Sequence, residues 1–173
     1  VDITLIEEPS ADLLAGLHDG AIDLAVIGFA SPPGRGIHAE IINDDVLVAA
    51  VNGHHALASR TSMSLRALVD YDLICLPRGS GIRAGLDEGC AAARLQARVA
   101  LEASNPEDVA DLAALGLGVA VLPESYARTR HDLHLVRLSR PTLRARVGAA
   151  WRADGRLSPA ASALIKLWKH RRR

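Results

Sequence analysis

Short β-rich runs alternate with helical stretches along the whole chain, and this alternation constrains the fold more than any other feature. Residues 2–7 predict a strand, Pro9 breaks it, and residues 10–18 predict a helix with Ser10 as its cap. A buried strand is expected at residues 23–28. Repeated strand-helix units of this kind predict an α/β domain with a largely parallel sheet.

The alternation continues towards the C-terminus. Further strands are predicted, in chain order, at residues 37–42, 46–51, 73–77, 98–103 and 119–122. Further helices are predicted to begin at Ser64, after the glycine loop 78–81, at Ser104 and at Ser158. Glycines at the expected helix ends, Gly20 and Gly116, support these boundaries.

Two of the helix predictions are specific enough to check in detail. Ser104 and Glu107 have the spacing of a capping box, in which each side chain binds a free amide at the helix start. In the last helix Leu164, Leu167 and Trp168 recur at i, i+3 and i+4, which predicts one buried stripe.

Composition supports a globular domain and argues against nucleic-acid binding by this chain. The 173 residues are 49% apolar but only 3% aromatic, so the core must consist of Ala, Val, Leu and Ile. The 20 basic residues balance the 20 acidic residues. A surface without excess positive charge attracts phosphate backbones weakly, so we expect this chain alone to be a poor nucleic-acid binder.

Cysteine usage and hydropathy indicate the compartment. Cys75 and Cys90 lie among apolar or small residues, which favours buried, reduced thiols over a disulfide. The sequence has no leader-like segment and no apolar run near 18 residues in length. We therefore expect a cytoplasmic protein without a membrane partner, although the first residue, Val1, lies directly inside a predicted strand and suggests a fragment.

The glycine loop after the strand 73–77 invites a nucleotide-binding interpretation that its spacing disfavours. Gly79, Gly81 and Gly85 give G-x-G-x-x-x-G, one residue longer than the dinucleotide fingerprint. What remains is a helix start whose free N–H groups favour a small anion. Ser80 also lacks the G-x-S-x-G context of a hydrolase nucleophile.

Other candidate motifs have simpler interpretations. The pairs His54-His55 and His131-His134 have no clear third ligand, so surface histidines are favoured over zinc binding. The basic tail 169–173 is interpreted as a solvated helix end. Asp44 and Asp45 point to opposite faces of a strand, so only one of them can enter a pocket. No cofactor and no metal site is predicted.

The order of motifs resembles the effector-binding domain of LysR-type transcriptional regulators. Four stretches carry the resemblance: VDITLIEEPSADLLAGLHDGAIDLAVIG, VLVAAVNGHHALASR, SLRALVDYDLICLPRGSGIR and, most specifically, DVADLAALGLGVAVLPES. Their order and spacing cover nearly the whole chain. The resemblance implies a type 2 periplasmic-binding-protein-like fold, α/β throughout, with two lobes joined by two crossover strands.

Carried onto this chain, the resemblance implies that residues 1–44 and 141–173 form lobe one and residues 45–140 form lobe two. The first strand-helix unit of lobe one and the DNA-binding domain would lie outside these residues. Strand ends that meet helix starts are common ligand sites in α/β sheets. The predicted effector-binding residues are Pro9, Ser10, Gly28, Phe29, Asp45, Gly79, Ser80, Gly81, Ile82, Ser104 and Asn105.

The resemblance implies a cytoplasmic, non-enzymatic sensor domain that binds a small carboxylate or an amino acid between its lobes. The intact regulator would be a homodimer or homotetramer that binds promoter DNA through its N-terminal domain. Two alternatives stay open: a periplasmic solute-binding protein with the same cleft, and an α/β enzyme of the hydrolase or dehydrogenase type. The missing triad and the faulty glycine spacing disfavour the enzyme.

Overall fold

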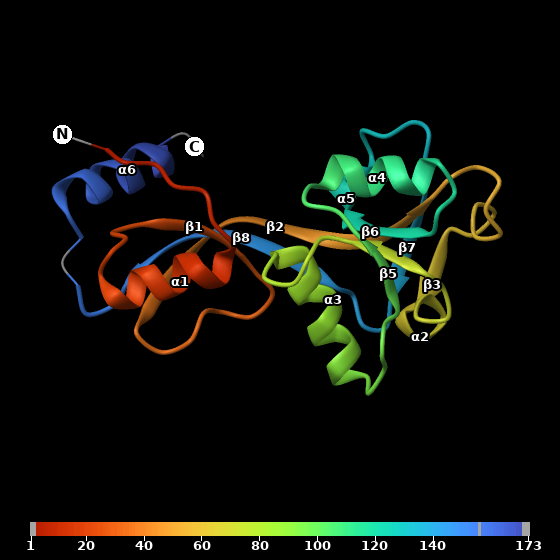
Figure 1. Cartoon of the computed structure of the whole chain (residues 1–173), viewed down its shortest axis with the longest axis horizontal. Helices are drawn as coiled ribbons and strands as arrows, with labels where there is room; N and C mark the ends of the chain where they lie inside the picture. The colour runs from red at the N-terminus through yellow and green to blue at the C-terminus, as the bar shows by residue number, and fades with distance from the viewer. Residues whose placement is uncertain (1–2, 156, 171–173) are drawn as a thin grey trace.

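The computed structural model describes residues 3–155 and 157–170, and it has two lobes (Figure 1). Two long strands, β2 (Ile37–Val51) and β8 (Arg144–Arg152), run side by side from one lobe into the other. The polypeptide both enters and leaves through the same lobe, on the left of Figure 1. None of the helices in the described residues combines the length and apolarity needed to cross a bilayer.

The left lobe, lobe one, contains α1 (Ser10–Asp19), β1 (Ala25–Phe29), one half of β2 and β8, and α6 (Pro159–His170). Alternate residues of β1 point towards α1, since Ala25, Ile27 and Phe29 are buried and Val26 is exposed. A small hydrophobic core results, formed by Leu13, Leu17, Ala25, Ile27, Phe29, Ile37 and Ala150.

The right lobe, lobe two, contains the larger core. Its elements are β3 (Ser62–Ser64), α2 (Leu65–Leu68), β4 (Leu73–Cys75), α3 (Gly81–Ala92), β5 (Val99–Glu102), α4 (Pro106–Ala114), β6 (Val119–Pro123), α5 (Glu124–Ala127) and β7 (His134–Ser139). The second half of β2 lies at the centre, where five consecutive residues, 47–51, are buried on both faces. Val, Leu, Ile and Ala dominate this core, as the low aromatic content predicts.

The sheet is mixed, which corrects the prediction of a largely parallel one. Strands follow the order β1-β8-β2-β6-β4-β5, and β7 also pairs with β2. Pairs β4–β5, β4–β6 and β3–β7 are parallel, whereas every pair that includes β2 or β8 is antiparallel. The two predicted strands 37–42 and 46–51 are one strand with an irregularity between Ile41 and Asn43.

The N-terminal strand predicted at residues 2–7 is not present in its described part. Residues 3–9 have no regular structure, and Ile3, Leu5 and Ile6 are 78%, 93% and 50% exposed. A strand requires a neighbour for its backbone hydrogen bonds, and no strand of the described residues pairs with this segment. Residue 2 lies outside the described residues.

Two helix predictions are also corrected. The cap of α4 is Asn105 rather than Ser104: the Asn105 side chain accepts from the Asp108 amide, and its Nδ2 donates to the Asp108 carboxylate. In α6 the buried residues are Ala161 and Ile165, whereas Leu164 and Leu167 are more than half exposed. The Trp168 side chain, predicted in the same stripe, lies outside the description, as do residues 171–173 of the basic tail.

The exact lobe boundaries, between residues 44 and 45 and between residues 140 and 141, stay a prediction.

Candidate functional site

The two lobes touch where the carboxyl end of β1 meets the amino end of α3. A Cβ built on Gly28 would lie only 2.6 Å from the Gly81 backbone nitrogen, and one built on Gly81 would lie 2.8 Å from that of Phe29. Two backbones can approach this closely only where side chains are absent. Gly28, Phe29 and Gly81, all predicted site residues, are therefore brought together at the interlobe boundary.

Ser10 joins the same boundary from lobe one. It was predicted to cap α1, but α1 has no side-chain cap, and Pro9 occupies the cap position. The Ser10 hydroxyl oxygen instead accepts a hydrogen bond of 3.0 Å from the Gly28 amide. Pro9 faces lobe two, since a Cβ on Gly79 would lie 3.9 Å from the Pro9 Cβ.

The glycine loop opens α3, as predicted, and Ser80 is the N-cap of that helix. The Ser80 hydroxyl oxygen accepts from the Arg83 amide at 3.2 Å and donates to the Pro77 carbonyl at 3.0 Å. Gly79 has φ +96°, a left-handed value that favours glycine and directs the chain into the helix. Ile82, the next predicted residue, is buried in the lobe-two core.

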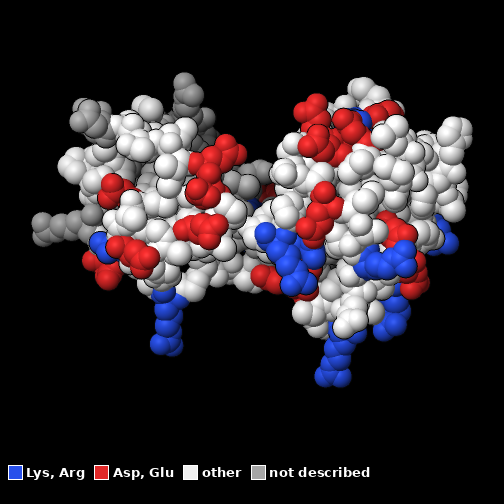
Figure 2. All heavy atoms as spheres, viewed as in Figure 1, with Lys and Arg blue, Asp and Glu red and all other residues white. Residues whose placement is uncertain are grey.

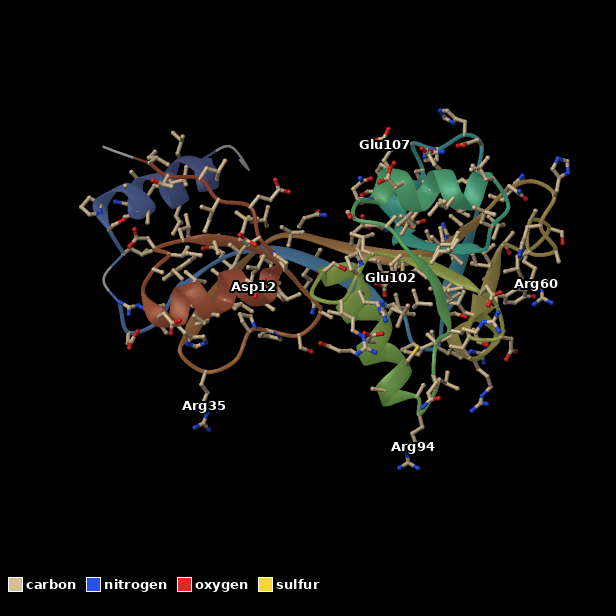
Figure 3. The ribbon with its side chains drawn as sticks, in the orientation of Figure 1. Asp12, Arg35, Arg60, Arg94, Glu102 and Glu107 are labelled. Atoms are coloured by element: carbon tan, nitrogen blue, oxygen red, sulfur yellow. The ribbon has the colours of Figure 1, made fainter. Side chains whose placement is uncertain are left out.

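A buried arginine beside this helix start was not among the predicted site residues. The side chain of Arg83 is 8% exposed; its Nε donates to Asp87 at 3.0 Å and its Nη1 to Glu102 at 2.5 Å. Glu102, at the end of β5, lies beside α3 in Figure 3. The Arg83 guanidinium thus pairs with two carboxylates, so the three side chains together carry a net charge of −1. An Asp four residues after an Arg was the only local signal for this cluster.

The turn from β5 into α4 lies on the same side of the sheet as the α3 helix start. The Ala103 amide donates to the Cys75 carbonyl at 3.2 Å, which fixes this turn beside the end of β4. Asn105 uses its carbonyl oxygen as the α4 cap, and Ser104 is exposed. The carboxyl ends of β4 and β5 are therefore adjacent. Among the described residues, no hydrogen bond joins the Asn105 side chain to Ser80.

Asp45 and Asp44 are both engaged at the crossover strands. Asp45 accepts from the Val46 amide and from the Ser125 hydroxyl and amide, so its carboxylate is held within lobe two. Asp44 pairs with Arg144 at 2.7 Å and with Arg146 at 3.3 Å. The Arg144 hydrogen bond lowers the pKa of Asp44, and Arg146 adds to this effect against the opposing influence of burial.

A hydrogen bond also crosses between the lobes. The Ser31 hydroxyl, in the loop after β1, donates to Glu88 on α3 at 2.6 Å. Together with the Gly28–Gly81 approach, it holds lobe one against α3. Figure 2 shows a notch between the lobes, with acidic side chains on both of its sides.

The fold and this interlobe boundary together define a periplasmic-binding-protein-like effector domain. The LysR substrate binding domain family matches the chain over residues 1–173. The chain is therefore the effector-binding domain of a LysR-type regulator and belongs to this family.

Known proteins agree with this assignment. The chain is 27% identical over 161 residues to YybE of Bacillus subtilis (strain 168), an uncharacterized HTH-type transcriptional regulator; the match covers 93% of this chain and 55% of YybE. It is 31% identical over 160 residues to a probable hydrogen peroxide-inducible genes activator of Mycobacterium leprae (strain TN), covering 89% of this chain and 51% of that protein. The chain thus spans about half the length of the curated relatives it matches.

Among solved structures, the effector binding domain of QuiR in complex with shikimate superposes with a TM-score of 0.79. The match covers 95% of this chain and 78% of the QuiR chain, at 19% identity. At this identity the likeness establishes the shared fold.

Proposed function

We propose that this domain senses a small carboxylate or, as a second choice, an amino acid bound between its lobes. The observation that carries the proposal is the convergence of Ser10 and Gly28 from lobe one with Ser80 and Gly81 from lobe two. Gly28 lies at the carboxyl end of β1, whereas Ser10 begins α1 and Ser80 with Gly81 begins α3. A strand end that meets helix starts is the arrangement that favours anionic ligands in α/β folds.

Charge supports this choice of ligand class. The N-terminus of α3 directs a partial positive charge to the boundary, and each such helix end favours an anion by about 0.3–1 kcal/mol. Charged hydrogen bonds add roughly 1.5–3 kcal/mol each, so a few contacts give micromolar to millimolar affinity. The related QuiR domain was solved with shikimate, which carries a carboxylate. The acidic Glu102 and Asp87 around Arg83 give weight to an amino acid, whose ammonium group they would attract.

The most direct test is calorimetry with a panel of small carboxylates and amino acids on wild type, Ser80→Asp and Ser59→Asp. Asp is itself a good helix cap, so Ser80→Asp preserves α3 while placing a negative charge against the ligand. Ser59 is exposed in a loop of lobe two and provides the same charge change away from the boundary. We expect binding to wild type and Ser59→Asp and at least a tenfold loss in Ser80→Asp. Equal affinity in all three proteins would exclude the glycine loop from the site.

We further propose that the intact protein is a cytoplasmic, non-enzymatic regulator that binds promoter DNA as a homodimer or homotetramer. The zero net charge of this chain indicates that DNA affinity belongs to another part of the protein. Residues 1–173 should therefore give only weak, sequence-independent binding in a gel shift at physiological salt. Sub-micromolar, sequence-selective binding by these residues alone would contradict this assignment.

A further inference from the structure

A second concave site lies in lobe two, at the opposite ends of its parallel strands from the interlobe boundary. A cavity of about 530 Å³ opens between the turns that precede β4 and β6, the start of β5 and the loop after β2. The β4–β6 register begins at Leu73 and Val119, so the cavity lies at the amino ends of these strands. Its volume falls within the usual range for small-molecule sites.

We call this cavity the distal pocket. Its walls are fixed by backbone hydrogen bonds and close backbone contacts. The Val119 amide donates to the Asp72 carbonyl at 2.9 Å, and a Cβ on Gly118 would lie 2.7 Å from the same oxygen. Gly116 has φ +81°, which lets the chain turn back after α4 and close one side of the pocket. The pocket is thus part of the folded lobe.

The polar groups of the distal pocket favour a cation. Asp70 and Asp72 contribute two carboxylates, and Arg98, paired with Asp72, contributes one cation. In the described residues no hydrogen bond or ion pair engages the Asp70 carboxylate. The C-terminal end of α4 faces the same turn, and its last turn contains no basic residue to offset its partial negative charge.

The remaining wall is apolar and aromatic. Leu117, which is 52% exposed, and the half-buried Val69 present aliphatic surface. Tyr71 lines the pocket beside His55, with ring centroids 5.6 Å apart. The His55 Nδ1 accepts from the Leu57 amide at 3.1 Å, which fixes the orientation of that ring. Asp70 and Tyr71 both line this pocket, and an organic ammonium group is attracted by a carboxylate and by an aromatic ring.

We propose that the distal pocket binds a small organic cation, a protonated amine attached to an apolar or aromatic body. Asp70 binds the ammonium group, Tyr71 contacts it through the ring face, and Leu117 with Val69 covers the body. Arg98 limits the affinity by repelling the ligand. This site is separate from the interlobe boundary and does not depend on the function proposed there.

Three probes of similar shape and different charge test the proposal: benzylamine, benzyl alcohol and benzoate. Each is titrated into the ¹⁵N-labelled 173-residue chain while backbone amide resonances are followed by NMR. Benzylamine should shift the amides of Tyr71 and residues 116–119 in a saturable manner, with millimolar affinity. Benzyl alcohol should bind more weakly at the same amides, and benzoate should not perturb them.

Charge variants locate the site through effects of opposite sign. Asp70→Asn should weaken benzylamine binding about two- to fivefold, and Arg98→Gln should strengthen it by a similar factor. Glu107→Gln, at the other end of α4 (Figure 3), removes the same charge as Asp70→Asn and should leave the affinity unchanged. Absence of binding, stronger binding of benzoate at these amides, or identical benzylamine affinity in all variants would each overturn the proposal.

Discussion

Gly28 and Gly81 bring the backbones of the two lobes into direct contact, with 2.6 Å between a hypothetical Gly28 Cβ and the Gly81 nitrogen. The atoms on both sides belong to the main chain, so neither side can yield by rotating a side chain. The separation of the lobes in this structure therefore depends on two residues that have no side chain.

Gly28→Ala should force the lobes apart and destabilise the protein by about 1–3 kcal/mol, the usual cost of inserting a methyl group into a filled space. Urea unfolding measures the change. Gly34→Ala is the control, because a Cβ at Gly34 meets nothing within 4 Å. Equal stability of the two variants would show that the lobes do not rest on each other in solution.

Ser10→Ala should affect β1 and leave the start of α1 unchanged. The variant removes the acceptor of the Gly28 amide, a loss of about 0.5–1.5 kcal/mol. Hydrogen exchange should become faster at the Gly28 amide and not at the first amides of α1. Ser64→Ala provides the contrast, since Ser64 does cap its helix, at Ala67. Faster exchange at the α1 start in Ser10→Ala would restore the capping role predicted from sequence.

The cap of α4 can be located by two single substitutions. Asn105→Ala should cost about 1 kcal/mol, because the Asp108 amide loses its acceptor. Ser104→Ala should cost a few tenths of a kcal/mol at most, as expected of an exposed position. Chemical denaturation resolves the two values, and a reversed order would identify Ser104 as the cap.

The free energy of unfolding should decrease at low pH because Asp44 then becomes protonated. Its pKa is held below the ordinary 3.8, chiefly by the Arg144 guanidinium, so the folded state favours the ionised carboxylate. This contribution is complete above the unfolded-state pKa and is lost as the pH falls through the lower, folded-state pKa. Asp44→Asn should be less stable than wild type at pH 6, by under about 1 kcal/mol, and the difference should vanish near about pH 2.

The unfolding free energy of both proteins should be measured across this range, with Asp154→Asn as the exposed control. A difference in unfolding free energy between wild type and Asp44→Asn that instead stays constant below pH 4 would show that ionisation of Asp44 beside Arg144 is not the source of the difference.

Cys75 and Cys90 should resist oxidation in the folded protein. Burial raises the pKa of Cys75 to about 11, although Arg83 opposes this, and it also raises that of Cys90. Little thiolate, the reactive form, is then present at neutral pH. Mass spectrometry after iodoacetamide treatment should find both thiols unmodified in native buffer and alkylated in guanidinium chloride. A rapid Cys75–Cys90 disulfide at stoichiometric peroxide would instead indicate a redox sensor.

Structural features that depend only on residues close together in the sequence could be predicted from the sequence. Ser64 caps the helix that it precedes, the glycine loop 78–81 opens α3, and Gly20 ends α1 in the left-handed conformation. The family resemblance supplied the two-lobed architecture, which the local patterns alone did not, since they favoured a largely parallel sheet. The antiparallel β2–β8 pairing joins residues about a hundred positions apart, and no local pattern records it.

Some of the residues that meet at the interlobe boundary could also be located from sequence, although their role in binding stays a proposal. Strand-end and helix-start residues on both sides of the boundary were identified because glycine, proline and serine mark them locally. The buried Arg83 cluster beside the α3 start was not predicted, because it depends on Glu102, nineteen residues away, and on the packing of α3. The Ser10 prediction assigned the hydroxyl to the wrong amide, since α1 and β1 meet only in the folded lobe.

The strand β2 contributes Ile37 to the core of lobe one and residues 47–51 to that of lobe two, and β8 is shared in the same way through Ala150 and Ala145. Neither core can be dismantled without breaking strands on which the other depends. The protein should therefore melt in a single cooperative transition, in which the calorimetric and van't Hoff enthalpies agree. Motion between the lobes is correspondingly restricted to bending within two continuous strands, and the irregularity after Ile41 is the natural position for that bend.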